Sequence, residues 1–286
     1  MENSMDTEKN AVIKGTLYIV GTPIGNLGDI SGRAVKVLSE VDFVAAEDTR
    51  ISGNLLSHLG IKKPLVNYFE HNKKSKGEEI LTRLKAGEAC ALVTDAGMPA
   101  ISDPGEDLVA LCAENSVPVC VIPGPCAAVS ALAVSGLPTR RFVFEGFLPV
   151  PAGERKKILD EIKSEKRTLI IYEAPHRLKK TLGDLFSALG DRKISLCREL
   201  TKINEEVIRT TLSSAEKSYD EKEPRGEYVL IIDGATEDDC FWKDMTEIQH
   251  VEYYTSLGMT KNDAMKAAAR DRGVGKSEIY AKIMKK

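Results

Sequence analysis

Carboxylates, small residues and prolines gather in two stretches that each follow an apolar run. The segment VTDAGMPAISDPGEDL, residues 93–108, places Asp95, Gly97 and Asp103 after one run, and IPGPCAA, residues 122–128, follows the next. Small residues and prolines let main chain, rather than side chains, face a ligand, and a helix that starts in the second stretch would offer amides to an anion. Because ligands bind at the carboxyl edge of parallel sheets, we predict one small-molecule site there.

The glycine-rich loop YIVGTPIGNLGD, residues 18–29, raises the question of a phosphate cradle. Its glycines at 21, 25 and 28 fit neither GxxxxGK[ST] nor GxGxxG. Pro23 also removes one amide donor that such a cradle would use. We therefore predict a tight strand-to-helix turn, and neither ATP or GTP hydrolysis nor dinucleotide binding.

Other site chemistries have little support in the 286 residues. The six cysteines form no CxxC pair and the four histidines no HxxxH pair, so we predict reduced, mostly buried thiols and no metal site. The apolar runs are far shorter than the roughly 20 residues that span a bilayer, and the polar N-terminus does not resemble a signal peptide. We expect a cytoplasmic protein, and the net charge of -3 means that any polyanion site is local.

Short β-branched runs alternate with helical periodicity, which predicts an α/β fold with largely parallel strands. We predict a leader at 1–13, an N-terminal α/β domain at 14–124, a C-terminal α/β domain at 125–236 and a helical extension at 237–286, with the first domain boundary lying between residues 122 and 139. The predicted strands are 16–21, 43–46, 89–94 and 117–122 in the first domain, and 142–148, 168–172, 194–198, 207–211 and 227–232 in the second.

Two helices and the C-terminal extension have clear local signals. Asp103, Pro104 and Glu106 predict an N-cap, a first-turn proline and a capping box for one helix, and apolar residues from Leu178 to Leu189 mark one face of another. From Thr260 onward, eight Lys and Arg against three acids give a local charge of +5. This charge fits an RNA or DNA backbone partner and fits equally a solvated helical cap.

A series of motifs resembles one enzyme family. In chain order they are GTLYIVGTPIGNLGDIS, AAEDTR, LVTDAGMPAISDPG, VIPGPCA, YEAPHRL, CRELTK and RGEYVLIIDG, which cover about residues 15–234. They are similar to the motifs of the ribosomal small-subunit RNA methyltransferase I family, within the tetrapyrrole methylase superfamily. The resemblance implies two α/β domains with an S-adenosylmethionine cleft between them, usually in a homodimer. The implied substrate is the 2'-hydroxyl of a cytidine in the decoding region of 16S ribosomal RNA, within the small ribosomal subunit.

The resemblance implies which residues bind the cofactor, and the chemistry of methyl transfer to a ribose adds hypotheses for substrate binding and catalysis. The cofactor-binding residues would be Asp95, Gly97, Met98, Ile101, Pro123, Cys126, Ala127, Tyr172 and Gly226. Substrate would be bound by Asn26, at the mouth of the cleft, and by Arg50 and Arg198, on RNA phosphate. Asp48 or Glu173 would accept the proton of the ribose hydroxyl.

The chain departs from the family pattern at two of these positions. Met98 stands where the family usually has threonine, and Cys126 stands where it usually has serine. Side-chain hydrogen bonds to the cofactor would be lost at both positions, whereas backbone contacts would remain.

Several of the motifs have a structural alternative. The EDTR motif fits a strand end with a surface ion pair as well as a catalytic group, and YEAPHRL fits the start of a helix, with His176 as a further candidate base. Two other functions stay open: a methyltransferase of the same fold acting on a tetrapyrrole or another small molecule, and a non-catalytic RNA-binding protein of ribosome assembly.

Overall fold

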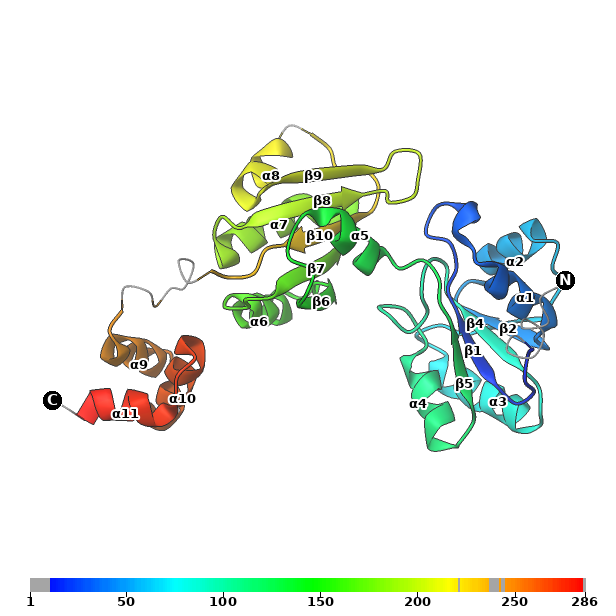
Figure 1. The fold of residues 1–286 in the computed structure, drawn as a ribbon, viewed down its shortest axis with the longest axis horizontal. Coiled ribbons are helices and arrows are strands. Elements are labelled where there is room, and N and C mark those ends of the chain that lie inside the picture. The colour runs from blue at the N-terminus through cyan, green and yellow to red at the C-terminus, as the bar shows by residue number, and fades with distance from the viewer. Residues whose placement is uncertain (1–10, 221, 237–241, 243–244, 285–286) are drawn as a thin grey trace, which may run out of the picture. The chain divides into compact units, whose positions relative to one another are not determined.

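The computed structural model describes residues 11–220, 222–236, 242 and 245–284 (Figure 1). Residues 1–10 of the predicted leader and most of the acidic segment 237–244 lie outside this range. The described chain divides into two compact units. The first holds residues up to 136 together with 196–208 and 226–229, and the second holds 137–195, 209–225 and 230–286.

The first unit contains a five-stranded sheet of order β3-β2-β4-β1-β5. Its strands are β1 (Leu17–Val20), β2 (Phe43–Ala46), β3 (Leu65–Asn67), β4 (Cys90–Val93) and β5 (Val119–Ile122). Its helices are η1 (Leu27–Asp29), α1 (Gly32–Glu40), α2 (Thr49–His58), α3 (Lys73–Lys85), α4 (Glu106–Glu114) and α5 (Ala127–Ser135). The pairings β1–β4, β1–β5, β2–β3 and β2–β4 are parallel, so the carboxyl ends of these strands share one edge.

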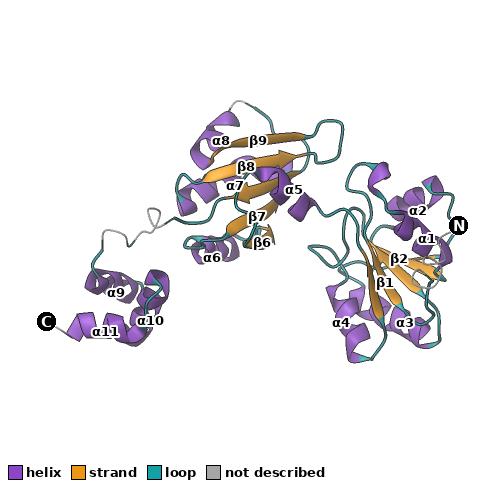
Figure 2. Cartoon of the chain, in the orientation of Figure 1, coloured by secondary structure: helices purple, strands orange, loops and turns teal. Residues whose placement is uncertain are grey.

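Alternation along the strands divides the core of this sheet into two layers. Tyr18 and Val20 pack in one cluster with residues of α1 and α2, whereas Leu17 and Ile19 pack in another with residues of α3 and α4. Successive strand side chains point to opposite faces, so the strands β1, β2 and β4, which are buried on both faces, are apolar throughout. Figure 2 shows the corresponding helices on either side of the sheet.

The second sheet has the order β6-β7-β10-β8-β9, with β6 and β7 parallel. Its elements are β6 (Phe142–Phe147), α6 (Ala152–Ile162), β7 (Thr168–Glu173), α7 (Pro175–Leu189), β8 (Lys193–Arg198), β9 (Glu206–Thr211), α8 (Leu212–Ser218) and β10 (Tyr228–Ile232). The C-terminal helices are α9 (Glu247–Ser256), α10 (Lys261–Arg272) and α11 (Lys276–Met284). A small apolar core that includes Val251, Met265 and Ile279 joins these three helices.

The structure confirms the α/β class and the two sheets, and it corrects three details. The units are not strictly consecutive, because residues 196–208 and 226–229 of the second half belong to the first unit. Strand β3 was missed, since it has three residues and none is fully buried. The predicted N-cap Asp103 is wrong: α4 begins after Gly105, whose φ of 146° suits glycine.

Candidate functional site

The loops after β1, β4 and β5 meet at the carboxyl edge of the first sheet. A Cβ built on Gly21 would lie 2.7 Å from the Cα of Gly124 and 2.7 Å from the Sδ of Met98. A Cβ on Gly124 would lie 2.8 Å from the Cα of Gly21. Because Cβ atoms do not approach other atoms so closely, only glycine fits at both positions. Main chain therefore forms this part of the edge, as the sequence predicted.

Thr22 joins the first of these loops to the second. Its amide donates to the carbonyl of Gly97 at 2.9 Å, and the amide of Gly97 donates back to the carbonyl of Thr22 at 3.2 Å. The hydroxyl of Thr22 is buried and donates to the carbonyl of Thr94 at 3.2 Å. The opening loop is thus fixed to the loop after β4, which makes it part of the same site.

The loop from Asp95 to Gly105 concentrates unusual backbone conformations. Gly97 has a φ of 87°, Ala100 of 66° and Ser102 of 67°. For alanine and serine this left-handed region is strained, and such strain persists where the surrounding structure holds the loop in one shape. Within this loop Asp95 and Ile101 are exposed, and Met98 packs partly against the core.

Four carboxylates lie close to this edge of the sheet: Glu47, Asp48, Asp95 and Asp103. The hydroxyl of Thr94 donates to Oε2 of Glu47 at 2.8 Å, and the amide of Asp48 donates to Oδ1 of Asp95 at 3.1 Å. Burial, helped by the charge of Glu47, raises the pKa of Asp103 from 3.8 to about 6 and also raises the pKa of Asp95. A cation bound beside these carboxylates would stabilise their ionised forms and lower their pKa values.

Asp48 is a helix cap and the partner of Arg50. Its Oδ1 accepts from the amide of Arg50 at 2.8 Å, and its Oδ2 pairs with Nη2 of Arg50 at 2.6 Å. The hydrogen bond with this guanidinium is the main reason that the pKa of Asp48 is lowered to about 2. The Arg50 side chain is 87% exposed, so both groups can be reached from solvent.

The start of α5 lies after the β5 loop. Pro123 is exposed and Cys126 and Ala127 are half-buried. Cys126 is the N-cap of α5, but no side chain makes a cap hydrogen bond there. An uncapped helix start, preceded by Pro123, Gly124 and Pro125, is suited to an anionic group of a ligand.

Three further predicted residues belong to the first unit. Asn26 accepts from the amide of Gly28 at 2.9 Å and so caps η1. Arg198, at the end of β8, pairs with Glu206 at 2.9 Å. Gly226 has a φ of 78°, and a Cβ there would lie 2.4 Å from Cγ of Glu199.

Tyr172 and Glu173 lie in the second unit. Tyr172 makes edge contacts with Phe144 and Phe147, with ring centroids 5.0 Å and 5.6 Å apart. The Glu173 side chain is fully buried; it accepts from the amide of Ala174 at 2.9 Å, pairs with Arg177 at 3.2 Å and accepts from the hydroxyl of Thr181. Through these contacts Glu173 stabilises the start of α7. They occupy its carboxylate, which therefore cannot contact a substrate.

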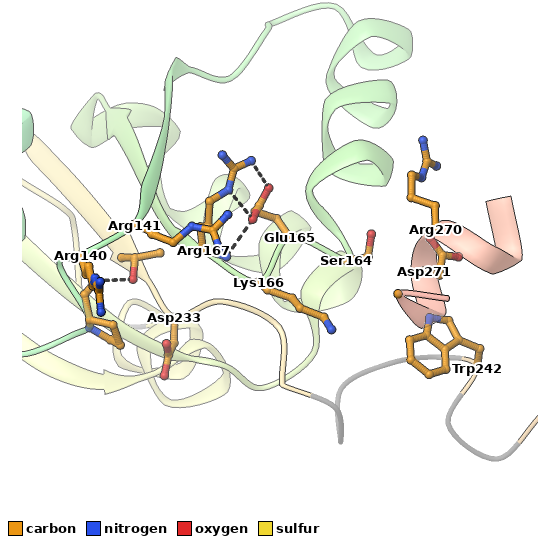
Figure 3. A pocket seen from close by; sticks show the side chains of 13 residues that line it. Arg140, Arg141, Ser164, Glu165, Lys166, Arg167, Asp233, Trp242, Arg270 and Asp271 are labelled. Atoms are coloured by element: carbon orange, nitrogen blue, oxygen red, sulfur yellow. Dashed lines mark hydrogen bonds and ion pairs between the residues drawn. The ribbon is translucent and has the colours of Figure 1, made fainter. Parts of the chain in front are cut away.

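A basic pocket lies at the amino ends of β6 and β7 (Figure 3). Arg140 and Arg141 precede β6, and Lys166 and Arg167 precede β7. Figure 3 shows the Arg167 guanidinium directed at Glu165, with which it pairs at 2.6 Å. The sequence analysis did not single out these residues, because they become neighbours only when β6 and β7 pair.

Comparisons with known proteins decide the family. A family profile described as Tetrapyrrole (Corrin/Porphyrin) Methylases matches residues 16–216. The ribosomal RNA small subunit methyltransferase I of Halalkalibacterium halodurans is 49% identical over 271 residues, which cover 93% of this chain and 94% of that protein. The chain belongs to the ribosomal RNA small subunit methyltransferase I family.

Other relatives agree with this membership. The ribosomal RNA small subunit methyltransferase I of Bacillus subtilis is 46% identical over 271 residues, covering 93% of each chain. Among solved structures, diphthine synthase matches with a TM-score of 0.59 and 16% identity over 77% of this chain and 90% of that one. Uroporphyrin-III-C-methyltransferase from Thermus thermophilus matches with a TM-score of 0.55 and 21% identity over 77% and 94%. At these identities the two structures show a shared fold alone.

Membership in this methyltransferase family confirms the predicted superfamily and its fold. Among the residues that the structure describes, no helix is long and apolar enough to cross a membrane, and no group of three or more His, Cys, Asp or Glu is arranged to hold a metal ion.

Two features of this edge were not predicted from the sequence. Thr94 was not a candidate, although its hydroxyl donates to Glu47 and its carbonyl accepts from the hydroxyl of Thr22. The approach of Gly21 to Gly124 was also not predicted, although Gly21 ends one predicted strand and Gly124 lies two residues after another. The location of both glycines at strand ends could have indicated this contact, since parallel strands bring their carboxyl ends together.

Proposed function

We propose that the protein transfers a methyl group from S-adenosylmethionine to the 2'-hydroxyl of a cytidine in the decoding region of 16S ribosomal RNA. The observation that carries this proposal is the 49% identity, over 93% of the chain, to a protein named as a small-subunit ribosomal RNA methyltransferase. The motifs from residue 15 to 234 and the basic C-terminal helices agree with it. The substrate would be the small ribosomal subunit, in the cytoplasm.

The loops after β1, β4 and β5 form what we call the strand-end site. Its polar groups fit those of S-adenosylmethionine. That cofactor has a carboxylate, an ammonium, a sulfonium and an adenosine, and when bound it supplies an electrophilic methyl group. The uncapped start of α5 at Cys126 suits the carboxylate. The carboxylates of Asp95 and Asp103 suit the cationic groups, because burial, with a smaller contribution from the charge of Glu47, raises their pKa values and a cation would stabilise their ionised forms. The main chain of Gly97, Met98 and Ile101 would contact the remainder.

Met98 and Cys126 can be accommodated in this assignment. Met98 packs partly against the core, and its Sδ lies near Gly21, so it contributes shape rather than a hydrogen bond. Cys126 makes no cap hydrogen bond, so its thiol is not required to start α5. Both departures from the family pattern are therefore compatible with binding through main-chain groups.

The second unit contributes to the proposal through Tyr172 and its neighbours. Tyr172 follows Ile171 near the carboxyl end of β7, where its ring contacts two phenylalanines. Gly226, in the first unit, precedes β10. We keep both as proposed cofactor contacts.

Asp48 is the better of the two proposed proton acceptors. Its carboxylate is accessible, whereas that of Glu173 is buried and engaged. With a pKa of about 2 Asp48 is a weak base while Arg50 holds it. If an RNA phosphate takes the exposed Arg50 guanidinium, the main cause of the low pKa is removed and Asp48 becomes a stronger base. Asn26 and Arg198 are kept as proposed substrate contacts.

The proposed homodimer is supported by exposed apolar residues on edge elements. Val119 and Val121 of β5 are 38% and 53% exposed, and Val129 of α5 is 49% exposed. An edge strand with outward valines is a surface that natural proteins usually cover. Light scattering should give twice the monomer mass, and a monomer at micromolar concentration would contradict the dimer.

One experiment tests the reaction itself. Small ribosomal subunits that lack the modification are incubated with the protein and isotope-labelled S-adenosylmethionine, and the labelled nucleoside is then located by mass spectrometry. We expect label on the ribose of one cytidine. Label on a base would contradict 2'-O transfer, and label on a tetrapyrrole but not on the subunit would contradict the RNA substrate.

A further inference from the structure

Ile203 is an aliphatic residue that the fold leaves almost completely in solvent. Its exposed fraction is 99%, and the next most exposed large hydrophobic residue among those described, Val150, is 77% exposed. Single exposed hydrophobic residues are common and usually need no explanation. The loop that carries Ile203 is the reason to consider a function for it.

The loop between β8 and β9 is held in one strained shape. Glu199 has a φ of 50° and Thr201 a φ of 66°, although neither is glycine. The amide of Thr201 donates to Oε2 of Glu205 at 2.6 Å, and the amide of Lys202 donates to the carbonyl of Glu199 at 3.0 Å. Ile203 lies within this braced turn, so its side chain is presented by an ordered backbone.

Lys202 holds the loop through two carboxylates. Its Nζ donates to Oε1 of Glu199 at 2.9 Å and to Oε2 of Glu227 at 2.7 Å. Burial lowers the pKa of Lys202, but the two ion pairs outweigh burial, so its pKa is raised overall. The lysine therefore stays charged and the bracing persists across the physiological pH range.

The same lysine connects the loop to the proposed site. A Cβ built on Gly25 would lie only 2.3 Å from Cγ of Lys202. Gly25 belongs to the opening loop, which Thr22 joins to the loop after β4 through backbone hydrogen bonds with Gly97. Ile203 thus directly follows Lys202, which contacts the opening loop, the rim of the strand-end site, at Gly25.

The charged groups around Ile203 are largely paired with one another. Glu199, Glu205, Glu206 and Glu227 lie in or beside the loop, and Lys202 and Arg198 are engaged with three of them. The aliphatic side chain of Ile203 itself offers a phosphate neither charge nor hydrogen bond, so it favours contact with the apolar face of a base.

We infer that Ile203 is a wedge that inserts between bases of the RNA substrate and helps to draw the target nucleotide out of its stack. This inference rests on the proposed function. A ribose hydroxyl in folded RNA must leave its stacked surroundings to enter a narrow site, and proteins that do this often fill the gap with an aliphatic side chain. Ile203 has the required chemistry, exposure and position beside the rim.

The test compares Ile203→Ala with Ile203→Leu, and uses Val150→Ala as a matched control for loss of an exposed aliphatic group. On subunits lacking the modification, Ile203→Ala should lower kcat/KM by roughly 5- to 100-fold, the range expected from loss of one stacking contact. Ile203→Leu should keep most of the activity, and Val150→Ala should match the wild type. The Kd for S-adenosylmethionine should be unchanged in all three.

A second readout separates a wedge from a structural role. In complexes of the subunit with the protein and S-adenosylhomocysteine, dimethyl sulfate should react more strongly with the target cytidine and its neighbours, and this increase should be lost with Ile203→Ala. Wild-type activity of Ile203→Ala, or an unchanged reactivity pattern, would overturn the inference. So would a change in oligomeric state, because Ile203 would then contact a second copy. If the wild-type protein methylates no subunit, the proposed function fails instead.

Discussion

The strand-end site of the first unit and the basic pocket of the second unit differ in almost every physical property. The first is lined by main chain, has strained residues at Ala100 and Ser102, and gathers carboxylates whose pKa values are raised. The second is lined by five arginine and lysine side chains, four of them on short segments before β6 and β7, against three carboxylates, Glu165, Asp233 and Asp271. One region suits a small cationic ligand and the other a polyanion, so a net charge of -3 conceals two opposite local charges.

The largest expected effect is steric and confined to the first region. Gly124→Val should weaken S-adenosylmethionine binding more than about 100-fold, because a side chain there meets the backbone of Gly21 at 2.8 Å and displaces the loops. Calorimetry measures the Kd, and circular dichroism checks folding. Gly153→Ala in α6 is the control, since nothing lies within 4 Å of its added Cβ. Unchanged cofactor binding by Gly124→Val would remove this junction from the site.

Substitutions of the two carboxylates predicted as bases should have different effects: one should slow the reaction and the other should destabilise the fold. Asp48→Asn should lower kcat about 100-fold and leave the cofactor Kd nearly unchanged, because general bases contribute in that range. Glu173→Gln should lower the free energy of unfolding by about 2–3 kcal/mol, because it weakens a buried ion pair with Arg177. Urea denaturation and initial rates measure these effects. Full activity of Asp48→Asn would exclude it from the reaction.

Asp103 should make the stability of the folded protein depend on pH. Its pKa is raised to about 6 in the folded protein, so its contribution to stability is complete below pH 4 and is lost as the pH rises through 6. Asp103→Asn should therefore stabilise the protein by about 1–2 kcal/mol at pH 7.5, after allowance for solvent screening, and should have little effect at pH 4.

The same substitution should weaken cofactor binding, since a negative partner of a cationic group is lost. Thermal unfolding at the two pH values and calorimetry at pH 7.5 provide the measurements. Equal stability of Asp103→Asn and wild type at pH 7.5 would mean that ionised Asp103 does not destabilise the folded protein.

The smallest effect is expected in the basic pocket. The double variant Arg140→Ser/Arg141→Ser should lower affinity for the small subunit a few-fold and reduce the salt dependence of binding by about 0.7 per lost phosphate contact. The cofactor Kd should stay the same. Lys36→Ser, which removes an exposed lysine paired with Glu40 in α1, controls for the loss of surface charge. An unchanged salt slope would show that RNA does not use this pocket.

Much of the fold could be predicted because its signals are local. Strand β2 was predicted with the bounds Phe43–Ala46 that the structure has, and the helix start allowed for YEAPHRL is found at α7. Apolar runs and helix-start residues act over a few positions, which a sequence displays directly. The capping box at Asp103 failed for the opposite reason: Gly105 takes a conformation set by the packing of the whole loop.

The sequence by itself determined the class of fold and the family, and it predicted the loops of one ligand site, because periodicity and motifs are properties of neighbouring residues. Only the tertiary structure decided that Glu173 is buried and that Lys202 touches the opening loop at Gly25. Burial and close approach depend on residues far apart in the chain, and these come together only when the strands pair and the loops pack. The pairing of Asp48 with Arg50 is local by contrast, and the EDTR motif already allowed it.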